Sequence, residues 1–183
     1  RYGVGSVWAE LSLHNWIKPV VEVGLGCADN TPDGNNYTYH SPLAPYFKIG
    51  VNYNFLYNST PDYQFTLGLR YGFTTFNYSI PDAWIDSEYW GEHVNLAVPR
   101  QSCTAGYGEI VAGLKVMVWR NVSLGWALKY HFRLHESATA YGQPWYIPGY
   151  GSRNGAITGA FSIMYTIPLN QRREDPVDTE KGL

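Results

Sequence analysis

The sequence predicts an all-β fold, an up-and-down antiparallel transmembrane β-barrel with about seven strands in this chain and eight in the intact protein. Three observations lead to this prediction. Apolar and polar residues alternate with a period of two, short and long connections alternate, and no apolar run reaches the roughly 18 to 20 residues of a membrane-spanning helix. The 183 residues are 45% hydrophobic and 15% charged, and their net charge of -2 gives no basic field for nucleic acid.

The alternation defines the expected strands. Every second residue is apolar from Phe47 to Phe55, from Phe65 to Phe73 and from Val122 to Leu134. Successive side chains of a strand point to opposite faces, so each run predicts a strand with one apolar face. The predicted strands cover residues 2–13, 19–27, 45–56, 63–77, 107–119, 122–135 and 154–169.

The connections between these strands alternate in length. Residues 15–18, 57–62 and 120–121 are tight turns, whereas 28–44, 78–106 and 136–153 are long loops rich in Pro, Gly, Asn and Tyr. This alternation is typical of outer-membrane barrels, whose turns are periplasmic and whose long loops are extracellular. The first strand runs toward a tight turn, so a barrel with an even number of strands predicts an eighth strand ahead of Arg1.

Alternation does not say which face is inside, because a soluble barrel or β-sandwich would turn the apolar rows inward. Two features favour apolar rows that face lipid. The polar rows are rich in small residues, which suit the narrow interior of an eight-stranded barrel. The apolar rows end in aromatic residues, as at membrane interfaces. We expect Trp16, Phe55, Tyr57, Trp119 and Tyr165 near the tight turns, and Tyr46, Phe47, Phe73, Phe76, Tyr130 and Phe132 near the long loops.

Charged residues on the polar rows predict a network of ion pairs inside the barrel. Buried charges are tolerated when they are paired and hydrogen-bonded. An eight-stranded barrel has too narrow a lumen for an ion pathway, so the expected role of these charges is structural. The predicted network consists of Glu10, Glu22, Lys48, Arg70, Glu109, Lys115, Lys129 and Arg133, with His131 on the same face.

No catalytic, cofactor or metal site is expected. The chain has no CxxC motif and no GxSxG elbow, and although His131 and His135 share a face with Ser123, a crowded lumen gives a substrate no access. The two cysteines, Cys27 and Cys103, both fall on the long-loop side. A disulfide between two loops and two free thiols are both open at this point.

The barrel is expected to cover residues 1–170, and the charged segment 171–183 is expected to form a periplasmic tail. The long loops are rich in aromatic residues, which either pack over the mouth of the barrel or bind a neighbouring subunit, as Tyr and Trp often do at interfaces. The candidates for such a partner-binding surface are Trp84, Tyr89, Trp90, Trp145 and Tyr146.

Six short motifs are more specific than the alternation: Lys48–Asn54 (KIGVNYN), Gly68–Phe73 (GLRYGF), Tyr89–Glu92 (YWGE), Glu109–Lys115 (EIVAGLK), Tyr146–Tyr150 (YIPGY) and Tyr165–Leu169 (YTIPL). Together they resemble a family of small outer-membrane β-barrels of Bacteroidota whose function is not characterised. The resemblance implies the barrel fold and the outer membrane, but no catalytic residues.

The expected function is that of a non-enzymatic accessory or scaffold subunit in an envelope complex, such as barrel-assembly or secretion machinery. A stand-alone surface or binding barrel is the alternative, and a lipid-modifying enzyme is a weaker one. The expected partners are outer-membrane lipid, lipopolysaccharide, and other outer-membrane or periplasmic subunits.

Overall fold

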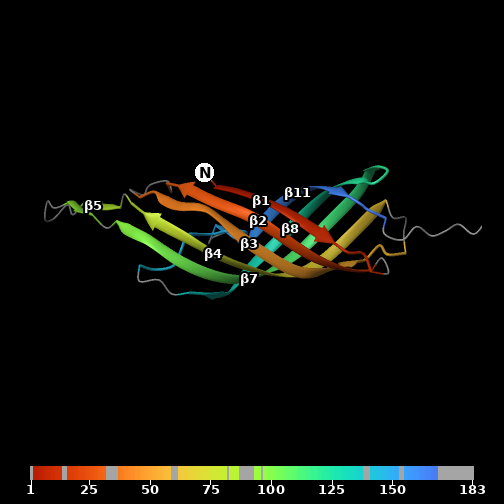
Figure 1. Ribbon diagram of the computed structural model, residues 1–183, viewed down its shortest axis with the longest axis horizontal. Coiled ribbons are helices and arrows are strands. Elements are labelled where there is room, and N and C mark those ends of the chain that lie inside the picture. The colour runs from red at the N-terminus through yellow and green to blue at the C-terminus, as the bar shows by residue number, and fades with distance from the viewer. Residues whose placement is uncertain are drawn as a thin grey trace, which may run out of the picture.

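The computed structural model describes residues 2–13, 16–31, 37–58, 62–81, 83–86, 93–95, 97–137, 141–152 and 155–168. Seven antiparallel strands form one curled sheet, which makes a half-barrel (Figure 1). Within the described residues, no helix could span a membrane. The seven strands are β1 (Tyr2–Glu10), β2 (Ile17–Asn30), β3 (Tyr39–Asn54), β4 (Tyr63–Ile80), β7 (Val98–Trp119), β8 (Val122–Glu136) and β11 (Ile157–Tyr165).

Two small hairpins lie in the long connections. One pairs β5 (Trp84–Asp86) with β6 (His93–Asn95), and β5 projects far from the sheet at the long-loop end (Figure 1). The other pairs β9 (Tyr146–Ile147) with β10 (Gly151–Ser152). Neither hairpin joins the seven-stranded sheet, so the wall of the half-barrel comes from the seven long strands alone.

The strands follow one another in the sheet in the order β1-β2-β3-β4-β7-β8-β11, each antiparallel to the next. The predicted up-and-down topology is therefore confirmed. β1 and β11 are the two edges of the sheet, and seven alternating strands give these edges the same direction. Direct pairing of β1 with β11 would be parallel, so an all-antiparallel closed barrel requires one more strand between them, running the other way.

Several strands are longer at the long-loop end than the sequence predicts. β3 begins at Tyr39 and β7 at Val98, rather than near residues 45 and 107. The pairing register shifts between Gly26 and Ala28 on β2 and between His40 and Tyr46 on β3. These irregularities interrupt the simple alternation, because an extra residue moves the following side chains to the other face.

The apolar rows lie on the outer face of the half-barrel, and the rows of small and polar residues face inward. On β4 the exposed series is Tyr63, Phe65, Leu67, Leu69, Tyr71 and Phe73. Leu114 on β7, Trp126 on β8 and Phe161 on β11 are exposed in the same way. The alternative in which the apolar rows form an inner core is wrong.

Aromatic side chains line the outer face near the tight turns. The ring of Tyr53 lies 6.1 Å from that of Trp16 and 5.0 Å from that of Phe55, which in turn lies 5.7 Å from Phe65. At the long-loop end, Phe47, Phe73 and Tyr130 are exposed as expected. Tyr46 and Phe76 are not, because both face inward and are buried. Tyr46 precedes Phe47 directly, and adjacent residues of a strand cannot share a face.

Candidate functional site

The inner face carries a cluster of charged side chains that we call the luminal charge network. It consists of Glu22, Lys48, Arg70, Glu109, Lys129 and His131. The register of the sheet builds it, because Glu22 lies opposite Lys48 and Glu109 lies between Arg70 and His131 on neighbouring strands. Directly opposite side chains share a face, so the charges meet without any contribution from a loop.

Each carboxylate of this network contacts several cations. Lys48 Nζ lies 2.5 Å from Glu109 Oε2 and 3.8 Å from Glu22 Oε1. Arg70 Nη1 donates to Glu22 Oε2 at 3.0 Å and lies 3.7 Å from Glu109 Oε1. Lys129 Nζ reaches Glu109 at 3.7 Å and Glu22 at 4.0 Å. Because Glu22, Lys48 and Glu109 are almost fully buried, their charges depend on one another for stability.

Two glycines make room for the aromatic side chains around Lys48. Its Nζ lies 5.2 Å from the ring centre of Tyr46 and 5.6 Å from that of Tyr107, as in cation–π contacts. A Cβ at Gly24 would overlap the Tyr46 ring, and a Cβ at Gly72 would overlap the Tyr107 ring. The small residues of the polar rows therefore admit the large side chains that surround the charges.

A second polar group lies nearer the tight turns. Lys18 Nζ lies 3.6 Å from Glu10 and donates to Gln64, and Asn52 donates to Glu10 at 2.7 Å. The sequence analysis missed Lys18, which it placed in a turn. Lys18 lies four residues before Glu22 on β2, so both side chains point to the same face of the sheet. The sequence would have predicted this if the strand had been taken to begin at Ile17.

The structure separates the predicted lumen residues into three kinds. Glu10, Glu22, Lys48, Arg70, Glu109 and Lys129 face inward and form ion pairs. Lys115 faces inward but has no ion pair among the described residues, and its Nζ lies 3.4 Å from Thr166 Oγ1. Arg133 is exposed at the long-loop end of β8, so it does not belong to the luminal network.

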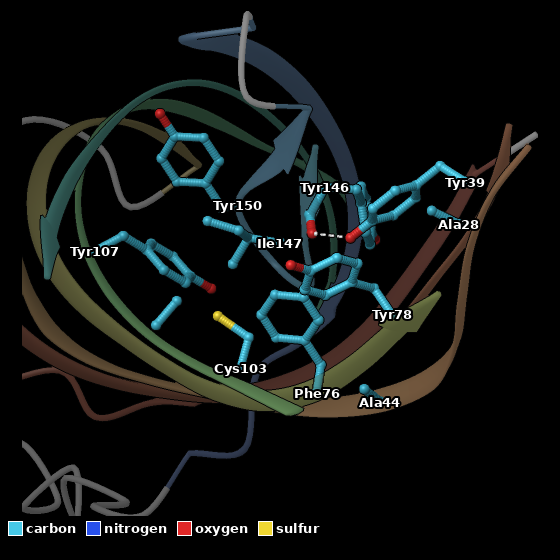
Figure 2. Close-up of a cluster of buried hydrophobic side chains, with 11 residues drawn as sticks. Ala28, Tyr39, Ala44, Phe76, Tyr78, Cys103, Tyr107, Tyr146, Ile147 and Tyr150 are labelled. Carbon is cyan, nitrogen blue, oxygen red and sulfur yellow. Dashed lines mark hydrogen bonds between the residues drawn. The ribbon is translucent and has the colours of Figure 1, made fainter. Parts of the chain in front are cut away.

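The long-loop end of the half-barrel is filled by residues 141–152, which we call the luminal hairpin. Three buried tyrosines from the wall donate hydrogen bonds to its backbone: Tyr39 to Tyr146 O at 3.1 Å, Tyr78 to Gly142 O at 2.9 Å and Tyr107 to Pro148 O at 3.4 Å. Figure 2 shows Tyr39, Tyr78 and Tyr107 around the buried Ile147. The hairpin therefore packs inside the curl of the sheet.

The turn of the luminal hairpin requires glycine at one position. Gly149 has φ of 76°, a conformation that side chains disfavour, and a Cβ there would overlap Tyr107. The hairpin also holds two predicted partner-binding residues. Tyr146 is fully buried, and Trp145 packs edge-on against Tyr39 with ring centres 5.9 Å apart. The side chains of Trp84, Tyr89 and Trp90 lie outside the described residues.

The two cysteines do not form a disulfide. Cys103 points inward and is buried beside Phe76 and Tyr78, whereas Cys27 lies opposite Gly3 on the outward row. β3 and β4 separate the two strands that carry these cysteines. Both cysteines lie near the long-loop end of their strands, but their thiols are on different faces of the sheet.

His131 lies between a hydroxyl and a carboxylate. Its Nε2 lies 2.7 Å from Thr158 Oγ1, and its Nδ1 lies 3.5 Å from Glu109 Oε2 without a hydrogen bond. A catalytic triad needs a hydrogen bond from the nucleophile to the histidine and another from the histidine to the acid. Here the contact with Thr158 is present, but the hydrogen bond between His131 and Glu109 is missing. In the described part of the chain, no group of three His, Cys, Asp or Glu side chains is placed to hold a metal ion.

Together these observations define a class: an antiparallel half-barrel with apolar side chains outside and paired charges inside. The chain matches the family described as a domain of unknown function, DUF6048, over residues 2–172, so it belongs to that family. No curated protein and no solved structure matches it.

Proposed function

We propose that the chain forms the wall of an outer-membrane β-barrel that serves as a non-catalytic accessory or scaffold subunit of a larger envelope complex. The observation that carries the membrane part is the continuous apolar band on the outer face. On β4 this band runs from Tyr63 to Phe73, and the next outward residues are Thr75 and Asn77.

The height of the band matches a bilayer. About eleven residues at roughly 3.3 Å each span about 36 Å along a strand. With a tilt of about 45°, this corresponds to roughly 25 Å across the membrane, the height of the apolar band of known outer-membrane barrels. In this arrangement the tight turns face the periplasm and the long loops face the cell exterior.

The filled lumen supports a scaffold role rather than transport. The luminal hairpin occupies the long-loop end, and the luminal charge network occupies the middle. The charges of this network pair with one another, which leaves them less available to a passing ion. In such a subunit the outer face and the loops contact lipid, lipopolysaccharide and neighbouring proteins.

The membrane part is tested by two substitutions on one face of one strand. Leu69, 61% exposed in the middle of the band, is changed to Arg, and Thr75, just beyond the band, is changed to Arg as the control. In a bilayer Leu69→Arg should cost about 2–4 kcal/mol of folding stability, whereas Thr75→Arg should cost about 0–1. Urea unfolding in lipid vesicles measures both. Equal effects, or a wild type that is stable and monomeric without lipid or detergent, would refute the membrane location.

The scaffold part is tested separately by mild-detergent purification of the full-length protein from the native membrane. Stoichiometric co-purification of one defined set of envelope proteins is expected. A protein that leaves the membrane as a monomer under the mildest conditions would favour the stand-alone surface barrel.

The enzymatic alternative depends on the contact between His131 and Thr158. If that pair acts on lipid, His131→Asn should abolish an acyl-transfer or hydrolytic activity on purified lipopolysaccharide, and Thr158→Val should do the same. The long gap between His131 Nδ1 and Glu109, together with the burial of His131, argues for a structural hydrogen bond instead.

A further inference from the structure

The wall forms a seat for the luminal hairpin at its long-loop end. A Cβ at Gly26 on β2 would overlap the hydroxyl of Tyr146 and crowd Pro148. Other small inward residues of β2, β3 and β7 are buried in the same cluster as the hairpin: Ala28, Ala44 and Ala105. The space that the hairpin fills is therefore made by small side chains of the wall.

Only the middle of the luminal hairpin is enclosed. Residues 144–150, which we call the plug, are buried except for the partly exposed Trp145. The flanking residues 141–143 are exposed, and residues 151–152 are partly exposed. The chain thus enters the lumen and leaves it again on the long-loop side.

The plug lies outside the backbone ladder of the wall. The strands of the hairpin, β9 and β10, pair with each other and not with the seven-stranded sheet. Tyr39 and Tyr107 of the wall donate side-chain hydrogen bonds to the carbonyl groups of Tyr146 and Pro148. Loss of one such bond changes an equilibrium by about two- to tenfold. The plug can therefore leave its seat while the strand pairing of the wall stays intact.

Two glycines flank the plug in a backbone conformation that favours glycine. Gly142 and Gly151 both have φ of 103°. A Cβ at either position would meet no atom within 4 Å, so packing does not require glycine there. Gly149 differs, because a Cβ there would overlap Tyr107 and Tyr46. The backbone conformation accounts for glycine at the two points where the chain enters and leaves the lumen, and hinges of moving loops lie at such positions.

The plug covers two features of the lumen. The ring of Tyr150 lies 5.4 Å from that of His131, which is next to Glu109 of the luminal charge network. Ile147 belongs to the cluster that buries Cys103 to 1% exposure, and Figure 2 shows both side chains in this cluster. Departure of the plug would expose the charge network and the Cys103 thiol together.

We propose that the plug is a gate, which leaves its seat as a unit about Gly142 and Gly151 while the seven-stranded wall stays folded. A segment outside the backbone ladder opens at a lower free energy than the sheet that surrounds it. The closed plug shields the luminal charge network from the long-loop side, and the open plug admits water and small solutes to it. The ion-paired side chains still fill the middle of the lumen, so opening does not make a pore. The gate is independent of the membrane location and of any partner.

The rate at which Cys103 reacts with a small methanethiosulfonate reagent measures the opening. The full-length protein carries Cys27→Ser, so that Cys103 is the remaining cysteine of the 183 residues. Below the unfolding transition, the rate should change little with urea, because opening of the plug exposes little surface. A rate that rises as steeply with urea as the global unfolding equilibrium would overturn the proposal. A rate equal to that of free cysteine would also overturn it, because the plug would then not be closed.

Substitutions at the flanking glycines assign the opening to the plug. Gly142→Ala and Gly151→Ala each place a side chain at a positive φ in the closed state, so each should raise the labelling rate at least about fivefold. Gly159→Ala is the matched control, because its Cβ also meets no atom within 4 Å but Gly159 lies in β11, away from the hairpin. It should leave the rate unchanged. Equal effects at all three positions would overturn the assignment of the hinges.

A substitution in the seat tests the contact that holds the plug closed. Tyr39→Phe removes the hydrogen bond to the carbonyl of Tyr146 and should raise the labelling rate about two- to tenfold, with the same shallow dependence on urea. Tyr71→Phe is the control, because Tyr71 is exposed on the outer face of the wall. An unchanged rate in Tyr39→Phe, or the same increase in both variants, would overturn the role of the seat. The urea dependence in the Cys27→Ser background decides the proposal even if one of these variants does not fold.

Discussion

Loss of the Glu109 charge should be the most damaging single change to the luminal charge network. Glu109 is fully buried, and its carboxylate lies 2.5 Å from Lys48 and 3.7 Å from both Arg70 and Lys129. In Glu109→Gln these three cations keep only Glu22, at distances of 3.8, 3.0 and 4.0 Å. Removal of one partner from a buried ion pair costs about 3–5 kcal/mol. Because Glu22 remains, we expect the lower part of this range.

Equilibrium unfolding of the full-length protein by urea in detergent micelles measures this loss. Glu10→Gln is the matched control, because Glu10 is partly exposed and contacts one cation, Lys18, at 3.6 Å. Its cost should be about 0–1 kcal/mol, because the variant loses one partly exposed ion pair while its amide oxygen can still accept the hydrogen bond from Asn52. The double variant Glu109→Gln, Lys48→Met should lose less than the sum of its parts. A cost below about 1 kcal/mol for Glu109→Gln, or strict additivity, would refute the account of the network.

Three further outcomes can be checked with the same unfolding assay or by thiol labelling. Arg120 has φ of 42° in its two-residue turn, so Arg120→Gly should stabilise the protein by about 1 kcal/mol, and destabilisation would contradict the turn geometry. Gly24→Ala should cost about 1–3 kcal/mol because its Cβ meets a tyrosine ring, whereas Gly5→Ala meets no atom within 4 Å and should cost nothing; equal costs would contradict the packing. Burial raises the pKa of the Cys103 thiol, which lies beyond the apolar band, whereas Cys27 is only partly buried. Cys27 should therefore react faster with maleimide at neutral pH, and equal rates would show that Cys103 is accessible.

The period of two was sufficient to predict the strands and the two faces of each strand, because residues such as Phe65, Leu67 and Leu69 must share a face. The strand order was predicted from the alternation of short and long connections, and the outward direction of the apolar rows from the small residues opposite them and the aromatic residues at their ends. The luminal network follows by the same parity, since Glu22, Lys48, Arg70 and Glu109 all occupy the opposite row. What parity cannot supply is the register between strands, which brings Arg70 opposite Glu109.

The sequence did not predict that residues 141–152 form a hairpin packed inside the curl of the sheet. The sequence places residues 136–153 in a long loop, and in the structure β9 and β10 of this segment pair with each other and not with the seven-stranded sheet. Its position inside the barrel depends on hydrogen bonds from Tyr39, Tyr78 and Tyr107, which are spread over three strands. A tyrosine on a strand fits either face, so the residue type alone does not reveal that these three point inward.

The glycines and tyrosines of the inner face act as one unit. The seven strands curl tightly around the inner face, so a large ring on one strand requires a missing side chain on its neighbour. Tyr46 lies over Gly24, and Tyr107 lies over Gly72. Both rings then contact Lys48 at the centre of the ion pairs. The glycines of the polar rows, which led us to predict that the apolar rows face outward, therefore also allow aromatic rings to enclose the buried Lys48. This coupling explains why the polar rows combine the smallest residues with charged ones, a pattern that a water-facing sheet would not need.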